Sequence, residues 1–408
     1  MDKAILFISG GLEAVPGILL AKKMGLHTVV SDINADAPGF AVADGRIYAS
    51  TYDSEATVAA ASRYHSEVRK LDGVMSVGAD VPFTVATVAA VLGLPGIPIE
   101  SARIASDKLA MKERFQSDGV PIPWFSPVES PQHLKEIILE HGYPMVLKPV
   151  DSRGARGVLR LQSGLDLGWA FLHSQANSPT GRVMIERFLS GPQISTESLV
   201  VDGRTFTPGF SDRNYEHLER FAPHIIENGG QIPGYLDERS RELIYELLPS
   251  TASSLGVRDG VIKGDIVVHE GRPYVIEVAP RLSGGYFCTH EIPLNTGVDL
   301  VGNAIRLALG LTVKPEDLLP SQNIPVAQRY WFPDTGRISR IGDHERFLNH
   351  PHVHLLEIRK KVGDRISKMD SHPDRAGVVI TTGDTLDEAV AFAEHIVASV
   401  PIEVDPHS

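Results

Sequence analysis

Two carboxylates, Asp265 and Glu277, stand twelve positions apart in a segment with the pattern of a β-hairpin. The segment reads IKGDIVVHEGRPYVIEV, and its turn residues lie near Glu270 and Gly271. A three-residue loop centred on Gly271 would place the two acids directly opposite each other, with Cβ atoms ~4.5–5.5 Å apart. Carboxylates at that distance repel unless a cation lies between them, and Mg²⁺ is commonly held by carboxylates together with phosphates. The spacing therefore predicts a magnesium site, whereas a register shifted by one residue would turn one acid to solvent.

The segment PMVLKPVDSRGARGV combines a lysine in an apolar strand with a glycine-rich loop. Lys148 follows three apolar residues, and the loop that begins four residues later contains Gly154 and Gly157. Those glycines allow a tight loop whose backbone N–H groups point at an anion, while Arg153 and Arg156 add positive charge or lie in solvent. We expect a lid over a triphosphate, and the alternative is an ordinary surface turn.

A third motif, PRLSGG, follows the hairpin directly, and Arg281 lies four residues beyond Glu277. Ser283, Gly284 and Gly285 can present backbone donors to an oxyanion or a phosphate. The alternative for Arg281 is a structural salt bridge.

The fourth motif is IERFLSGPQIS, in which Glu186 ends the apolar strand VMIE. The backbone at Phe188 and Leu189 could hydrogen-bond the edge of an adenine, as hinges between domains often do. Nothing in the local pattern demands this interpretation.

The elements that position these motifs begin with alternating strands and helices in residues 1–100. AILFIS, HTVVSD and GVMSVG are short strands with the apolar composition of a sheet buried on both faces, and FTVATVAAVLG is a helix that ends at Gly93. This pattern predicts a doubly wound α/β domain. SGGLEAVPG departs from the GxGxxG fingerprint, so a dinucleotide site is not favoured.

The rest of the chain divides at the linker LPGIPIES. Residues 101–310 form the central region, with a compact α/β subdomain at about 121–189 followed by a part dominated by strands. Residues 311–408 are expected to form a small α+β domain, in which RAGVVITTGD is a strand and LDEAVAFAEHIVASV an amphipathic helix. The expected fold class is therefore α/β and α+β.

The composition of the chain limits its expected binding partners and cellular location. The 408 residues carry a formal charge of −12, which does not favour nonspecific binding to nucleic acid or to an anionic membrane. The N-terminus lacks the pattern of a signal peptide, and no apolar run approaches the ~18 residues of a membrane span. Cys288 is the one cysteine, and we interpret it as a small buried residue, with a catalytic nucleophile as the alternative. We expect a cytoplasmic protein with no membrane or nucleic-acid partner.

Taken in order, the four motifs resemble those of the ATP-grasp superfamily, with the nearest likeness to biotin carboxylase, the purine-pathway ligases and the L-amino acid ligases. The resemblance implies a pre-ATP-grasp domain at 1–100, an ATP-grasp domain at 101–310 with its lid at about 121–189, and a C-terminal domain at 311–408. It also implies an ADP-forming carboxylate–amine ligase that works through an acyl phosphate, such as an L-amino acid (dipeptide) ligase. ATP and Mg²⁺ (which Mn²⁺ can replace) are the implied cofactors, a small carboxylate and an amine the substrates, and a homodimer the assembly.

The resemblance also assigns roles residue by residue. Lys108 and Lys148 would contact phosphates, residues 152–158 would form the flexible loop, and Gln193 would contact the ribose. Glu186 would accept from the adenine amino group, and Arg281 would steady the acyl phosphate. The implied ATP-binding residues are Lys108, Lys148, Ser152, Arg153, Gly154, Ala155, Gly157, Glu186, Arg187, Phe188, Leu189 and Gln193; the metal ligands are Asp265 and Glu277; the catalytic residues are Arg281 and Lys148.

Two positions depart from the family pattern. Ala279 stands where many members have the Asn ligand of a second Mg²⁺, and Gln193 replaces a Glu but still accepts from a hydroxyl. Because Ala279 cannot bind metal, a catalytically silent ATP-binding relative is one alternative. A bicarbonate-using carboxylase or carbamoyl-type enzyme is the other.

The substrate is expected near SGGYF and near 211–226, a stretch whose basic and aromatic residues suit a carboxylate or simply form a solvated face. Glu291 or His290 could serve as the base for a protonated amine. The residues expected to contact substrate are Arg281, Ser283, Gly284, Gly285, His290, Glu291, Arg213 and His217.

Overall fold

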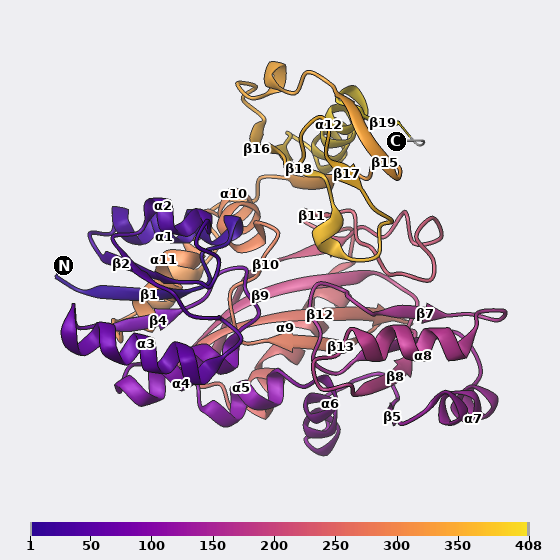
Figure 1. Cartoon of the computed structure of the whole chain (residues 1–408), viewed down its shortest axis with the longest axis horizontal. Helices are drawn as coiled ribbons and strands as arrows, with labels where there is room; N and C mark the ends of the chain where they lie inside the picture. Colours follow the sequence, from indigo (N-terminus) through magenta and orange to yellow (C-terminus); the bar gives the residue numbers. More distant parts are fainter. Residues whose placement is uncertain (1, 406–408) are drawn as a thin grey trace.

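The computed structural model describes residues 2–405 of the chain (Figure 1). Its N-terminal region contains a four-stranded sheet in the order β3-β2-β1-β4, and each pairing is parallel. The strands are β1 (Ala4–Ile8), β2 (His27–Ser31), β3 (Gly45–Ile47) and β4 (Gly73–Met75). The predicted parallel α/β arrangement of this region is confirmed.

Strand β1 is covered on both faces because its residues alternate between two cores. Ile5 and Phe7 pack with α1 (Val15–Lys23) and α2 (Pro38–Val42). Ala4, Leu6 and Ile8 pack on the other face with α3 (Ser54–Glu67) and α4 (Pro82–Leu92). The first core also contains Leu300, Val301 and Ala304 of α11 (Leu300–Ala308), so a helix from the C-terminal end of the central region packs into the N-terminal domain (Figure 1).

A smaller antiparallel sheet in the order β5-β8-β6-β7 forms the lid subdomain. Its strands are β5 (Phe125–Val128), β6 (Met145–Pro149), β7 (Leu159–Leu161) and β8 (Val183–Arg187). Apolar side chains from α7 (Pro131–His141) and α8 (Leu167–Ala176) pack on this sheet. All five residues of β6 are buried, so Lys148 lies on a buried strand, as its apolar neighbours predicted.

The large sheet has eight strands in the order β13-β12-β9-β10-β11-β14-β18-β16. Five come from the central region: β9 (Gln193–Val201), β10 (Arg204–Arg213), β11 (Gly230–Ile232), β12 (Gly260–His269) and β13 (Arg272–Ala279). Helices α6 (Lys108–Ser117) and α9 (Glu238–Ser254) pack against it. The other three strands, β14 (Val326–Tyr330), β16 (Val353–Ile358) and β18 (Gly377–Thr382), come from the C-terminal part of the chain.

The β12–β13 hairpin places Asp265 opposite Glu277, as predicted, but by a different route. The loop has two residues, Glu270 and Gly271, both with positive φ, and not three. A two-residue loop alone would pair Asp265 with Ile276. A bulge between Asp265 and Ile266 shifts the register by one residue and restores the pairing with Glu277.

The remaining C-terminal elements include a small sheet in the order β17-β15-β19 and the helix α12 (Leu386–Ser399). The predicted helix is thus confirmed, and Ala389, Ala393 and Ile396 of its apolar face are buried. The small strands are β15 (Gly336–Ile341), β17 (Arg365–Ile366) and β19 (Ile402–Asp405); the short helices are α5 (Ile99–Ala105) and α10 (Ile292–Thr296). Among the described residues, no helix has the length and apolar character needed to cross a membrane.

Candidate active site

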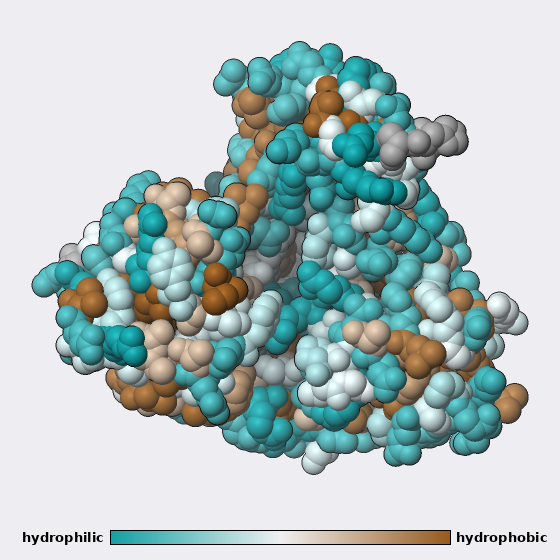
Figure 2. All heavy atoms as spheres, viewed as in Figure 1, coloured by the Kyte–Doolittle hydropathy of each residue, from teal (hydrophilic) through white to brown (hydrophobic). Residues whose placement is uncertain are grey.

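Two adjoining cavities lie where the N-terminal domain, the central region and the C-terminal part meet. Figure 2 shows a hollow with a mostly hydrophilic rim at this place. The first cavity, of about 250 Å³, lies between the lid subdomain and the β12–β13 hairpin, and the second, of about 490 Å³, continues toward the C-terminal part. The residues shared by the two cavities are Asp80, Arg153, Gly154, Arg213, Lys263, Arg281 and His372.

The first cavity brings together nearly all the predicted ATP-binding and metal residues. Gly157 is the exception: it does not line the cavity, and a Cβ at this position would point at Asn177 and Pro149. The predicted residues that line the cavity are Lys108, Lys148, Ser152, Arg153, Gly154, Ala155, Glu186, Arg187, Phe188, Leu189, Gln193, Asp265, Glu277 and Arg281.

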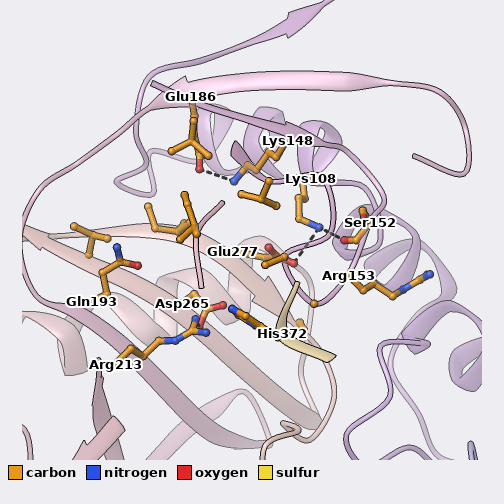
Figure 3. Close-up of a pocket in the computed structure, with 18 of the residues that line it drawn as sticks. Lys108, Lys148, Ser152, Arg153, Glu186, Gln193, Arg213, Asp265, Glu277 and His372 are labelled. Carbon is orange, nitrogen blue, oxygen red and sulfur yellow. Dashed lines mark hydrogen bonds and ion pairs between the residues drawn. The ribbon is translucent and has the colours of Figure 1, made fainter. Parts of the chain in front are cut away.

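Glu186 is fully buried between two lysines, as Figure 3 shows for one of them. Lys148 Nζ lies 2.5 Å from Glu186 Oε1, and Lys112 Nζ lies 3.0 Å from Oε2. Burial by itself would raise the pKa of Glu186, but the charges of Lys112 and Lys148 hold it below its ordinary value. Burial lowers the pKa of Lys112 to about 8 although Glu186 opposes the shift. The sequence reading missed Lys112, which lies one helical turn after Lys108 and therefore on the same face of α6.

Lys108 joins the glycine-rich loop to the hairpin. Asp107 caps α6 by accepting from the backbone N–H groups of Leu109 and Ala110, which fixes Lys108 at the first position of the helix. Lys108 Nζ donates to the carbonyl of Ser152 at 2.7 Å and lies 3.3 Å from Glu277 Oε1 (Figure 3). A single cation thus connects a loop residue with one of the two hairpin carboxylates.

The other hairpin carboxylate, Asp265, is also surrounded by cations. Arg213 Nη1 lies 2.9 Å from Asp265 Oδ1, and Lys263 forms an ion pair with the same oxygen. Burial would raise the pKa of Asp265, but Lys263 and Arg213 hold it well below its usual range. Within residues 2–405 no cluster of three or more His, Cys, Asp or Glu side chains is placed to hold a metal.

Arg281 lies at the boundary between the two cavities. Its Nε is 3.5 Å from Asp80 Oδ1, and the second oxygen of Asp80 lies 3.8 Å from Arg153 Nε. Burial would raise the pKa of Asp80, but Arg281 and Lys108 hold it below the ordinary value. Asp80 belongs to the N-terminal domain, so this acid connects that domain to both the loop and the PRLSGG motif.

The PRLSGG motif is partly occupied by two carboxylates of the protein. Ser283 donates from its backbone N–H to Glu197 Oε1 at 2.8 Å, and its hydroxyl donates to the other oxygen of Glu197. Burial raises the pKa of Glu197 to about 7, although the bonds from Ser283 oppose this shift. Gly285 donates to Glu13 Oε2 at 2.8 Å. Two of the three expected oxyanion donors are therefore engaged with side chains of the protein, whereas the Gly284 N–H makes no hydrogen bond within residues 2–405.

The C-terminal part contributes residues that no local motif indicated. His372 donates its backbone N–H to the carbonyl of Gly154 at 3.1 Å, and its ring lies beside Asp265 and Arg213 (Figure 3). Its Nε2 has no hydrogen-bond partner in the described structure, and burial lowers the pKa of His372 to about 3. Glu227 lies 2.7 Å from Arg213 Nε and 3.6 Å from Arg375 Nη1. Burial would raise the pKa of Glu227, but Arg213 and Arg375 lower it to about 2.

The structure also corrects the expected substrate set. Arg281, Ser283, Gly284, Gly285, Glu291 and Arg213 line the second cavity, but His217 and His290 line neither cavity. His217 packs against Phe221 and Phe332. His290 packs against Tyr286, and its Nδ1 shares a hydrogen bond with the hydroxyl of Thr289. His217 thus lies within the expected segment 211–226 and His290 lies close to SGGYF, but neither lines one of the two cavities.

Cys288 is fully buried, which agrees with its interpretation as a small interior residue. Its Sγ donates to the carbonyl of Ser283 at 3.2 Å. Burial raises the pKa of the Cys288 thiol well above its ordinary value, so the thiolate is disfavoured.

The comparisons with known proteins agree with this geometry. The family model of the ATP-grasp domain matches residues 105–285, and the model described as L-amino acid ligase C-terminal domain 2 matches residues 329–405. A protein of Sinorhizobium fredii, y4rH, is 24% identical over all of this chain and 84% of its own length. Pyruvate carboxylase of Pichia angusta is 23% identical over 70% of this chain, which spans only 24% of that enzyme. The crystal structure of L-amino acid ligase from Bacillus licheniformis shares the fold with a TM-score of 0.82 and 20% identity, over 99% of both chains.

Proposed function

We propose that this chain, which belongs to the ATP-grasp superfamily, is an ADP-forming ligase that joins a small carboxylate to an amine. The observation that carries the proposal is the junction of the two cavities. Paired carboxylates and two lysines line the first cavity. Arg281 lines both cavities, and the second has room for small substrates.

The first cavity suits Mg·ATP. The carbonyl of Phe188 and the backbone of Leu189 would face the adenine edge, since the N–H of Phe188 donates to Pro144. Gln193 would face the ribose, and Lys108 with loop residues 152–155 would face the phosphates. Asp265 and Glu277 fit Mg²⁺ because they are cross-strand partners that face the same cavity, and phosphate oxygens would complete the ligand set. The ion, when bound, supplies positive charge at the transferred phosphoryl group.

The proposed reaction has two steps. A substrate carboxylate attacks the γ-phosphorus of ATP, ADP leaves, and an acyl phosphate forms in the second cavity. An amine then attacks the acyl carbon, the C–O bond to phosphate breaks, and an amide remains. Lys148 and Arg281 stabilise the negative charge of the transferred group, and the glycine-rich loop keeps water from the intermediate.

Amino acids are the favoured substrates within this class. The match of residues 329–405 to an L-amino acid ligase domain supports this choice, because that part of the chain contributes Tyr330, Arg359 and Arg375 to the second cavity. A bicarbonate-using reaction is the second candidate, and the likeness to pyruvate carboxylase over 70% of this chain favours it.

The test is release of ADP and phosphate by the purified protein with Mg·ATP, against amino acids and other small carboxylates, singly and in pairs, with and without bicarbonate. We expect release that depends on particular acid–amine pairs, with the amide detected by mass spectrometry. Release that requires bicarbonate and no amine would favour the second candidate. ATP binding without ADP release under every condition would indicate the silent relative that Ala279 allows.

The family resemblance also implies a homodimer in the cytoplasm. Light scattering tests the assembly, since a dimer has twice the 44.3 kDa mass of the chain.

A further inference from the structure

Glu291 is a buried acid without a partner on the wall of the second cavity. It is the last residue of a π-helical turn, Phe287–Glu291, and its side chain is almost completely shielded, with 3% of the residue exposed. Within residues 2–405 its carboxylate makes no hydrogen bond and no ion pair. Burying an acid without a partner costs free energy, and proteins tolerate that cost mainly where a ligand supplies the partner.

The other acids of the second cavity are all engaged. Glu13 lies 3.3 Å from Arg359 and accepts from Gly285, Asp80 pairs with Arg281, and Glu227 pairs with Arg213 and Arg375. Glu291 is therefore the acid of this cavity, within the described chain, whose charge no side chain balances.

The charged groups nearest to Glu291 do not neutralise it. Burial raises the pKa of Glu291 to about 8, Glu227 adds to the shift, and Arg329 opposes it only partly. Arg329 is engaged elsewhere, with its Nη2 3.2 Å from Glu394 and its Nη1 donating to the carbonyl of Gly230 at 3.2 Å. A cationic ligand in the cavity would thus be the first full partner of this carboxylate.

The backbone that presents Glu291 is irregular and firmly held. Tyr286, just before the π-helical turn, has φ +65°, a conformation that a bulky residue rarely adopts. Its hydroxyl donates to Glu357 at 2.9 Å, and Gly285 beside it is held by Glu13. π-Helical turns and left-handed bulky residues concentrate at functional sites, where neighbouring contacts hold them in place. The same short segment carries Gly284 at one end and Glu291 at the other.

We propose that Glu291 binds the ammonium group of the nucleophilic substrate and removes its proton. The proposal rests on the ligase function above and narrows its second, nucleophilic substrate to a primary amine that arrives protonated, such as an amino acid, in place of a neutral amide. The ion pair between the Glu291 carboxylate and the substrate ammonium would then both bind the amine and prepare it to act as a nucleophile.

The step balances as follows. Glu291 carboxylate takes one proton from R–NH₃⁺, which leaves R–NH₂. The nitrogen lone pair attacks the acyl carbon, a C–N bond forms, and the C–O bond to phosphate breaks with its electron pair on the phosphate oxygen. The second proton leaves the nitrogen for that oxygen, which gives HPO₄²⁻, and Glu291 returns its proton to solvent.

Glu291→Gln tests the proposal, because glutamine keeps the size of the side chain but neither pairs with an ammonium nor takes its proton. Two nucleophiles are compared: the amine found by the substrate matrix, and hydroxylamine, which is largely unprotonated at neutral pH and traps acyl phosphate as a hydroxamate. We expect kcat/KM for the amine to fall roughly 100-fold or more, as for loss of a general base, while hydroxamate formation stays near that of the wild type.

Glu394→Gln is the matched control, since it removes the carboxylate paired with Arg329 outside the second cavity, and both of its activities should match the wild type. An equal loss of amide and hydroxamate in Glu291→Gln would assign Glu291 a structural role and overturn the proposal. Unchanged amide formation would overturn it as well. Hydroxamate formation by the wild type tests the ligase function separately, because that reaction does not need Glu291.

Discussion

The two cavities are built in different ways, although they share seven residues. The first draws most of its lining from the hairpin, the glycine-rich loop and the IERFL segment, and its acids Glu186, Asp265 and Glu277 each lie beside a lysine. The second is assembled from the N-terminal domain, the PRLSGG segment and the C-terminal part, and it contains the unpaired Glu291. Short motifs therefore supply most of the first cavity, whereas the lining of the second depends on the arrangement of the domains.

The largest expected effect concerns the carboxylates of the first cavity. The double variant Asp265→Asn/Glu277→Gln should lower the rate of ADP formation by ~1,000-fold or more, because a metal-bound phosphoryl group loses several kcal/mol of stabilisation. Steady-state assays measure the rate, and circular dichroism verifies the fold. Activity within a few-fold of the wild type would show that Asp265 and Glu277 do not hold a metal needed for the reaction. The proposed difference in chemistry between the two cavities would then fail as well.

Glu186→Gln should chiefly affect stability. Removal of this carboxylate leaves Lys112 and Lys148 buried without their counter-charge, and we expect a loss of about 3–5 kcal/mol in the free energy of unfolding. Urea titration measures it. A second change, Lys112→Met, should restore part of the loss because it removes one uncompensated charge. If Lys112→Met made the variant still less stable, the charge explanation would fail.

The contact between the first cavity and the C-terminal part should depend on pH, because Glu227 pairs with both Arg213 and Arg375. The pKa of Glu227 falls from 4.5 to about 2 on folding. Because the folded pKa is depressed, the stabilisation is complete above the unfolded value and is lost as the pH falls toward 2. Glu227→Gln should thus cost roughly 3 kcal/mol at pH 7 and about 1.5 kcal/mol at pH 3. Denaturant titrations of both proteins at the two pH values measure the difference, and a pH-independent cost would contradict the ion-pair assignment.

The smallest effect distinguishes two glycines of the same loop. Both have positive φ, but a Cβ at Gly157 would lie 2.7 Å from Asn177 Cβ, whereas at Gly154 the nearest atom is Pro373 Cδ at 3.4 Å. Gly157→Ala should lower stability by about 1–2 kcal/mol, and Gly154→Ala by less, because only the former adds a clash to the backbone strain. Thermal unfolding compares them. Equal losses would mean that the loop repacks freely.

The elements that the sequence predicts correctly are those in which a motif and its strand are contiguous. The buried strand around Lys148, the hairpin and the C-terminal helix are present as predicted, and the facing of Asp265 and Glu277 is confirmed. The bulge that produces this facing was missed, because a bulge shifts the register without a signature residue in this hairpin. His372, Arg375 and Asp80 were missed for another reason: strand order, and not local spacing, carries them to the cavities.

The shared eight-stranded sheet has one more consequence. Strand β11 is hydrogen-bonded to β14, and β14 is followed by β18 and β16, so the C-terminal part covers an edge that the central region would otherwise leave open. An uncovered edge presents unpaired N–H and C=O groups that recruit strands from other molecules. A chain cut before residue 326 would therefore lose protection against self-association along with a wall of the second cavity.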